Sequence, residues 1–129
     1  MRRDIYSNIG AVLALAPAVQ SANINGVAID TKGFGSVAIV LNTGAIVSAG
    51  DFSAKLQESD TTTSEDFTDV AAAQVQSNAP ATLAASSTYK LGYLGNKRYC
   101  RVVLTNAGGM SFAAGAAAIK GHPHDAPVA

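Results

Sequence analysis

The sequence is short of large aromatic side chains. It has no tryptophan, four phenylalanines and four tyrosines in 129 residues, so its hydrophobic fraction of 48% consists mainly of smaller side chains. A core of such residues removes less apolar area from water than an aromatic core does. We therefore expect thin, closely packed layers and a subunit that is stabilised by its neighbours.

Charge and cysteine are also scarce. Charged residues make up 14% of the chain, and nine basic residues balance nine acidic ones. Nucleic-acid binders usually carry a basic excess, so we expect no specific nucleic-acid partner. A single cysteine excludes an intramolecular disulfide framework and a cysteine-only zinc site within one chain. No apolar run approaches the ~20 residues that span a bilayer, so we expect no membrane partner.

Residues 1–22 combine a basic start with a short apolar stretch. Arg2 and Arg3, followed by the apolar residues 11–16, are features of a secretory leader, which is one interpretation. Asp4 within the basic start departs from that pattern. We therefore predict an extended N-terminal arm over residues 1–22, with an apolar face that packs on a neighbouring surface.

From residue 23 onward, short apolar segments alternate with turns rich in Gly, Asn, Asp and Ser. Residues 52–58 alternate apolar and polar side chains, the period of a strand with one buried face. Residues 97–105 form the strongest strand, in which Cys100 lies on the face opposite to Arg101. About seven such strands predict an all-β fold, an antiparallel β-sandwich of Ig-like or jelly-roll type, with a partly closed barrel as the competing arrangement. We place the sandwich at residues 23–120 and a C-terminal tail at 121–129.

Two polar segments are predicted to be turns. Residues 42–44, Asn-Thr-Gly, predict a tight turn that divides the apolar run around them. Residues 59–65 predict an exposed hairpin tip, and we interpret the acidic residues around it as solvated. They lack the glycine and the ligand spacing of a calcium loop.

Three groups of residues have a chemical and a plainer interpretation. His122, His124 and Asp125 include metal-ligand types, yet they lie in a proline-containing tail where solvent or a neighbouring subunit is the simpler partner. Cys100 has apolar strand-mates, which favours a core thiol over a nucleophile, and an inter-subunit cross-link is the alternative. We therefore predict no catalytic residues, no cofactor and no metal.

The third group is a basic and aromatic set of residues near the C-terminal strands: Lys90, Lys97, Arg98 and Arg101 with Tyr89, Tyr93 and Tyr99. On one sheet face they could stack nucleic-acid bases. They could equally pair with carboxylates of a neighbouring protein, which the zero net charge favours.

Several stretches resemble one family of small structural proteins, encoded in the head-morphogenesis modules of tailed bacteriophages and prophages. The resembling stretches are residues 30–34, 55–60, 67–70, 89–102 and 121–128. Each motif alone is short, and their order and spacing carry the resemblance. Residues 1–22 match no motif of the family, and Cys100 stands where an aliphatic residue is expected.

The resemblance implies a non-enzymatic virion component, most often a head decoration (cement) protein that binds the shell of major capsid protein. Neck or tail components and a virion-surface receptor- or carbohydrate-binding sandwich are the alternatives. It implies assembly in the bacterial cytoplasm, a place on the capsid surface and a homo-oligomer, with a trimer among the open arrangements. The expected partner contacts lie in the arm and the tail: Arg2, Arg3, Tyr6, Leu13, Leu15, Val19, His122, His124 and Val128.

Overall fold

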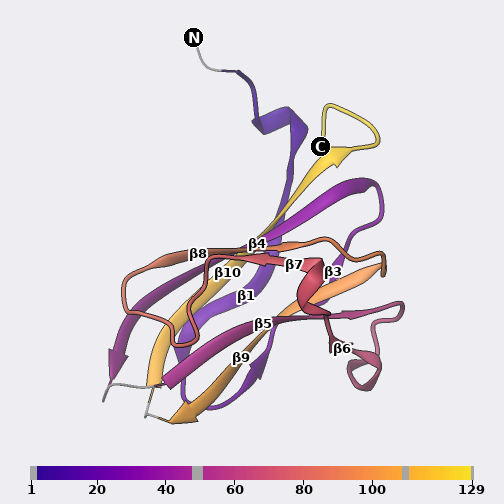
Figure 1. The fold of residues 1–129 in the computed structure, drawn as a ribbon. Coiled ribbons are helices and arrows are strands. Elements are labelled where there is room, and N and C mark those ends of the chain that lie inside the picture. The colour runs from indigo at the N-terminus through magenta and orange to yellow at the C-terminus, as the bar shows by residue number, and fades with distance from the viewer. Residues whose placement is uncertain (1–2, 48–50, 109–110, 129) are drawn as a thin grey trace.

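The computed structural model describes residues 3–47, 51–108 and 111–128, which fold into two antiparallel sheets (Figure 1). The first sheet has the strand order β1-β10-β4-β8-β7, and the second has the order β2-β9-β5-β6, with β3 also pairing with β9. No α-helix occurs among these residues, and the predicted β-sandwich is confirmed.

The strands of the first sheet are β1 (Gly10–Gln20), β4 (Phe34–Val47), β7 (Val75–Ser77), β8 (Thr88–Tyr93) and β10 (Ser111–Pro123). Those of the second are β2 (Ile24–Asn25), β3 (Ile29–Asp30), β5 (Asp51–Ser59), β6 (Thr68–Asp69) and β9 (Tyr99–Gly108). The described residues also include three short 3₁₀ turns: η1 (Tyr6–Asn8), η2 (Ser64–Asp66) and η3 (Ala72–Gln74).

The core lies between the sheets and follows the alternation of the strands. Cys100, Val102 and Leu104 on β9 are buried, as the spacing predicts, because alternate side chains of a strand share a face. On β10 the buried hydrophobic residues are Phe112 and three alanines, Ala114, Ala116 and Ala118. Phe52 of β5 and Phe112 of β10 stack across the sandwich with ring centroids 3.9 Å apart.

The predicted N-terminal arm is wrong for residues 10–20. These residues form β1, which pairs antiparallel with β10 along its length. The pairing shifts register between Leu13 and Leu15, and both Ala14 and Leu15 are buried in the core. The apolar stretch therefore finds its sheet partner within its own chain, about a hundred residues away.

Two other predicted boundaries also differ. Residues 42–44 form no turn, because β4 runs through them and pairs with β8 and β10. Gly44 allows this close approach, since a β-carbon there would lie 3.1 Å from the Cβ of Ala113. The predicted tail begins inside a strand, because β10 continues to Pro123 and pairs there with Phe34.

On the outer face of the second sheet, polar side chains hydrogen-bond to one another and to the segment that covers them. The guanidinium of Arg101 donates hydrogen bonds to Gln57 Oε1 and to Ser64 Oγ and lies 4.3 Å from the ring centre of Phe67. Gln57 in turn donates to Asp69, which also pairs with Lys55. These contacts hold the segment from Ser64 to Asp69 against the outer face of the sheet.

Candidate partner-binding surface

Exposed hydrophobic side chains gather at the N-terminal end of the described chain. Seven large hydrophobic side chains are exposed among the described residues; five of them fall between Ile5 and Val19, and the other two are Val27 and Leu94. Tyr6 is 85% and Val19 is 71% exposed. Contiguous apolar surface marks interaction sites, and these five residues are spread from the N-terminal turn along the length of β1.

The turn that carries Ile5 and Tyr6 is held in place by hydrogen bonds. Asp4 accepts a hydrogen bond from the backbone N–H of Ser7, and Asn8 donates its side-chain amide to the carbonyl of Asp4. Hydrogen bonds from Ser7 lower the pKa of the Asp4 carboxyl. Ile5 and Tyr6 are thus presented to solvent from a hydrogen-bonded turn.

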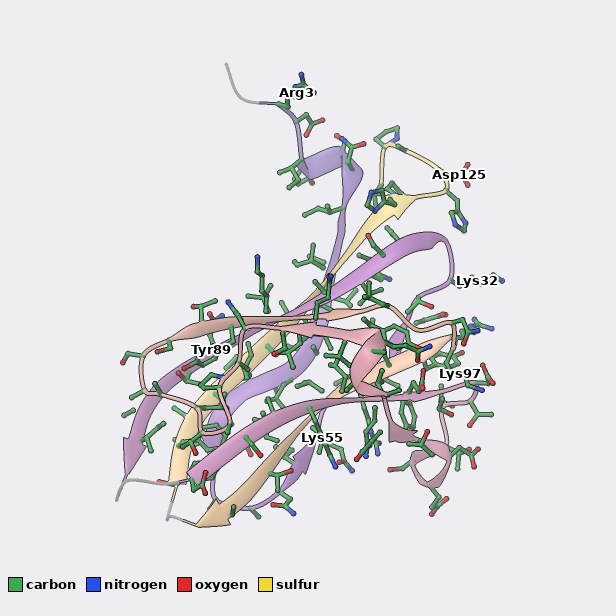
Figure 2. The ribbon with its side chains drawn as sticks, in the orientation of Figure 1. Arg3, Lys32, Lys55, Tyr89, Lys97 and Asp125 are labelled. Atoms are coloured by element: carbon green, nitrogen blue, oxygen red, sulfur yellow. The ribbon has the colours of Figure 1, made fainter. Side chains whose placement is uncertain are left out.

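The C-terminal loop lies beside this turn. The backbone N–H of Val128 donates to the carbonyl of Ser7 at 2.8 Å, and that of His124 donates to the carbonyl of Gly33. The imidazole of His122 is hydrogen-bonded through Nδ1 to Ser36 Oγ. Figure 2 shows Arg3 and Asp125 at this end of the molecule, well apart from Lys55 on β5 and Lys97 in the loop before β9.

Strand β1 forms one edge of the first sheet. It is eleven residues long, whereas the edge strands β7 and β6 have three and two residues. No charged residue lies between Gly10 and Gln20. A long uncharged edge strand presents unpaired backbone groups to any other extended chain, which natural proteins usually prevent.

Part of this edge is occupied within the chain. The carbonyl of Ala14 accepts a hydrogen bond from the N–H of Val27, and Pro17 has no N–H to donate. Before Ala14, Ile9 has extended backbone angles and leads directly into β1. Among the described residues, the continuous stretch whose outer edge makes no backbone hydrogen bond is therefore residues 9–13, and Val128 lines a small cavity together with Ile9 to Ala11.

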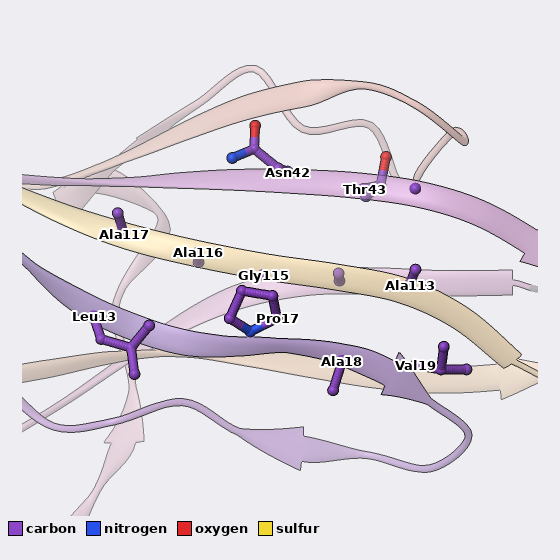
Figure 3. Close-up of a pocket in the computed structure, with 12 residues that line it drawn as sticks. Leu13, Pro17, Ala18, Val19, Asn42, Thr43, Ala113, Gly115, Ala116 and Ala117 are labelled. Carbon is purple, nitrogen blue, oxygen red and sulfur yellow. The ribbon is translucent and has the colours of Figure 1, made fainter.

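A shallow apolar groove of about 630 Å³ runs along the outer face of β10 (Figure 3). Its floor consists of outward residues without long side chains: Ala113, Gly115 and Ala117. Pro17 closes over this floor, since a β-carbon at Gly115 would lie 2.9 Å from Pro17 Cγ. The small residues on β10 thus leave room for Pro17 of the neighbouring strand β1 to lie against them.

The structure places the residues predicted to contact a partner in different settings. Tyr6, Leu13, Val19, Arg3, His122 and His124 are exposed, and Val128 is half-buried. Leu15 is 3% exposed and belongs to the core, so its prediction as a contact is wrong. The register shift beside it turns its side chain inward. Arg2 lies outside the described residues.

Cys100 is fully buried, in agreement with a core thiol. Burial raises the pKa of its thiol to about 12, with a smaller contribution from Glu58, so the reactive thiolate is disfavoured. The alternative of an inter-subunit cross-link is therefore wrong for the folded chain, because the Cys100 thiol is not exposed to a neighbour. Its place in the core follows from its apolar strand-mates.

The predicted basic and aromatic face does not form. Tyr93 is buried between the sheets and donates a hydrogen bond to Glu58, whereas Lys90 lies on the opposite side of β8. Burial, followed by the bond to Glu58, raises the pKa of Tyr93 well above its usual value. Arg101 is itself buried, under Phe67. Alternation along the strands separates these residues into different layers.

Within residues 3–47, 51–108 and 111–128, no three His, Cys, Asp or Glu side chains lie close enough to hold a metal ion. The described part also contains no helix that is long and apolar enough to cross a membrane. No family model, curated protein or solved structure matches the chain.

Sequence reasoning located Tyr6, Leu13 and Val19 but missed the exposed Ile5 and the edge position of β1. Ile5 has an available signal, since it is a large apolar residue beside the polar triplet that forms the turn. No sequence signal indicates that β1 is an edge strand, because the order of strands depends on pairings between distant segments.

Proposed function

We propose that the protein is a non-enzymatic structural subunit of a tailed-bacteriophage virion, a decoration protein that binds the shell of major capsid protein. The exposure of the large apolar side chains Ile5 and Tyr6 on the N-terminal turn supports this proposal most directly. The family resemblance over residues 30–128 supplies the identity of the shell. Assembly takes place in the bacterial cytoplasm, and the mature position is the capsid surface.

The surface that binds the shell is the end of the molecule formed by the N-terminal turn, residues 4–8, and the C-terminal loop, residues 124–128. Ile5 and Tyr6 are its apolar anchors, and both are more than half exposed. Arg3 and Asp4 directly precede them, and Asp125 lies at the same end of the molecule, so charges of both signs are present at this end. An apolar centre with a polar rim is the usual composition of a protein interface.

Such binding would stabilise the assembled shell without any chemical step. A subunit that binds the expanded shell but not its precursor favours the expanded state by mass action. The hydrogen-bonded turn limits the entropy lost on docking, because Ile5 and Tyr6 are already ordered by the contacts of Asp4, Ser7 and Asn8.

The test uses purified expanded capsids that lack this protein. Added protein should co-sediment with them and raise their melting temperature. Tyr6→Ser should weaken co-sedimentation about tenfold or more, because exposed aromatic anchors dominate such interfaces. Leu94→Ser is the matched control, since Leu94 is also exposed but lies at the end of β8, away from the turn. Equal loss with both variants would contradict the assigned surface.

The copy number per virion separates shell decoration from a neck or tail position. Hundreds of copies are expected for a decoration protein. A dozen or fewer would assign it to a neck or tail ring, and absence from purified virions would refute the structural role.

A further inference from the structure

The open edge of β1 is a second interaction surface, distinct from the turn assigned to the shell. Its free stretch, residues 9–13, is extended, uncharged and hydrogen-bonded to β10 on one side through Gly10–Leu13. Val12 and Leu13 are exposed on opposite faces of this stretch, at 39% and 52%. Backbone groups and apolar side chains are thus available together.

We propose that a second copy of this chain pairs antiparallel with residues 9–13 across a two-fold axis, so that the two first sheets join into one continuous sheet. This inference goes beyond the proposed function, which assigns no interface for self-association.

The length of the edges favours pairing between two copies of β1. The opposite edge of the same sheet, β7, has three residues, and β2, β3 and β6 have two each. A head-to-tail contact between β1 and any of these could form only a few hydrogen bonds. Two copies of β1 can pair over the whole open stretch, and the two-fold axis makes every contact twice.

The absence of charge also favours a second copy. Residues 9–13 are Ile, Gly, Ala, Val and Leu, so antiparallel pairing brings no like charges together. The same absence gives a foreign strand no electrostatic means of being selected. The pairing would cover Val12 on one face of the joined sheet and Leu13 on the other, which removes both from water.

Sedimentation velocity of the full chain over a wide range of concentration tests the proposal. We expect a reversible monomer–dimer equilibrium. Leu13→Lys and Val12→Lys should each raise the dimer dissociation constant by at least about tenfold, because each copy contributes one lysine to the same small interface. Leu94→Lys is the matched control and should leave the constant unchanged.

The outcomes that overturn the proposal are distinct from those that overturn the shell-binding role. A wild-type monomer, a trimer, or equal effects of the Leu13 and Leu94 variants would refute pairing through β1. Thermal melting shows whether each variant is folded, and hydrogen exchange should show concentration-dependent protection at residues 9–13. A dimer that fails to bind capsids would leave this inference standing and remove the proposed function, and a monomer that binds capsids would do the reverse.

Discussion

The outer faces of the two sheets differ in whether their polar groups find hydrogen-bonding and ion-pair partners within the chain. On the second sheet, Arg101, Gln57, Asp69 and Lys55 form a connected polar network, and the η2–β6 segment covers part of it. The first sheet has alanine and glycine along β10, an open groove beside them and a long uncharged edge.

This difference indicates where partners bind. The ion pairs described in the chain, Lys55–Asp69, Lys97–Asp60 and Arg98–Asp30, all involve the second sheet or the residues beside its strands. That side makes its strongest polar contacts internally. The first sheet leaves apolar surface and backbone groups unpaired, so a partner gains most by binding there.

We expect the largest change in stability from a substitution in the core, which lies between the two sheets. Phe112→Ala removes one ring of the stacked pair that joins the sheets and should lower the free energy of unfolding by about 3–5 kcal/mol. Both sheets should unfold in a single transition, measured by urea denaturation with two spectroscopic probes. Two separate transitions would show that the faces are supported independently.

The next largest change in stability is expected on the outer face of the second sheet, where the polar network lies. Arg101→Met keeps much of the buried side-chain volume but leaves Gln57 and Ser64 without their charged donor, and it should destabilise by about 2 kcal/mol. Hydrogen exchange should increase in residues 64–69. Lys55→Met, which removes an exposed ion pair from the same face, should change stability by less than about 1 kcal/mol.

A smaller change in stability is expected on the outer face of the first sheet, where alanine and glycine line β10. Gly115→Ala introduces a β-carbon 2.9 Å from Pro17 Cγ and should destabilise by about 1 kcal/mol through overpacking. Gly108→Ala is the control, because a β-carbon there meets no atom within 4 Å. Thermal unfolding of both variants measures the difference, and an unchanged Gly115 variant would show that β1 can move away from β10 easily.

The smallest effect should be the response to acid. The hydrogen bond from Arg98 lowers the pKa of Asp30 to about 2 from 3.8, so this carboxylate stabilises the fold above its unfolded pKa. That contribution is lost as pH falls from about 4 to about 2, and because the Asp30 side chain is 42% exposed, solvent screening should keep it below about 1 kcal/mol. Asp30→Asn should flatten this part of the stability profile. A variant with the wild-type profile would exclude Asp30 as its source.

Local alternation predicted much of the fold. The inward faces of 52–58 and of β9 follow directly from their sequence, because each strand has apolar side chains at every second position. The burial of Cys100 follows from the same pattern. These features depend only on residues close together in the chain.

Features that depend on distant partners were not predictable in this way. Residues 42–44 contain typical turn residues, but pairing with β8 and β10 holds them in β4. Leu15 was assigned to an arm because β10, its partner, lies at the far end of the sequence. The candidate surface is affected in the same way, because the sequence pattern does not show which strand becomes an edge.

The position of β10 determines when the first sheet can form during synthesis. It is the last described strand in the sequence, yet it lies between β1 and β4 in the sheet. A nascent chain therefore exposes the facing sides of β1 and β4 until β10 has left the ribosome, and pairing across so long a loop is slow. During that interval both strands are open to pairing with other chains, a hazard that chaperones typically suppress.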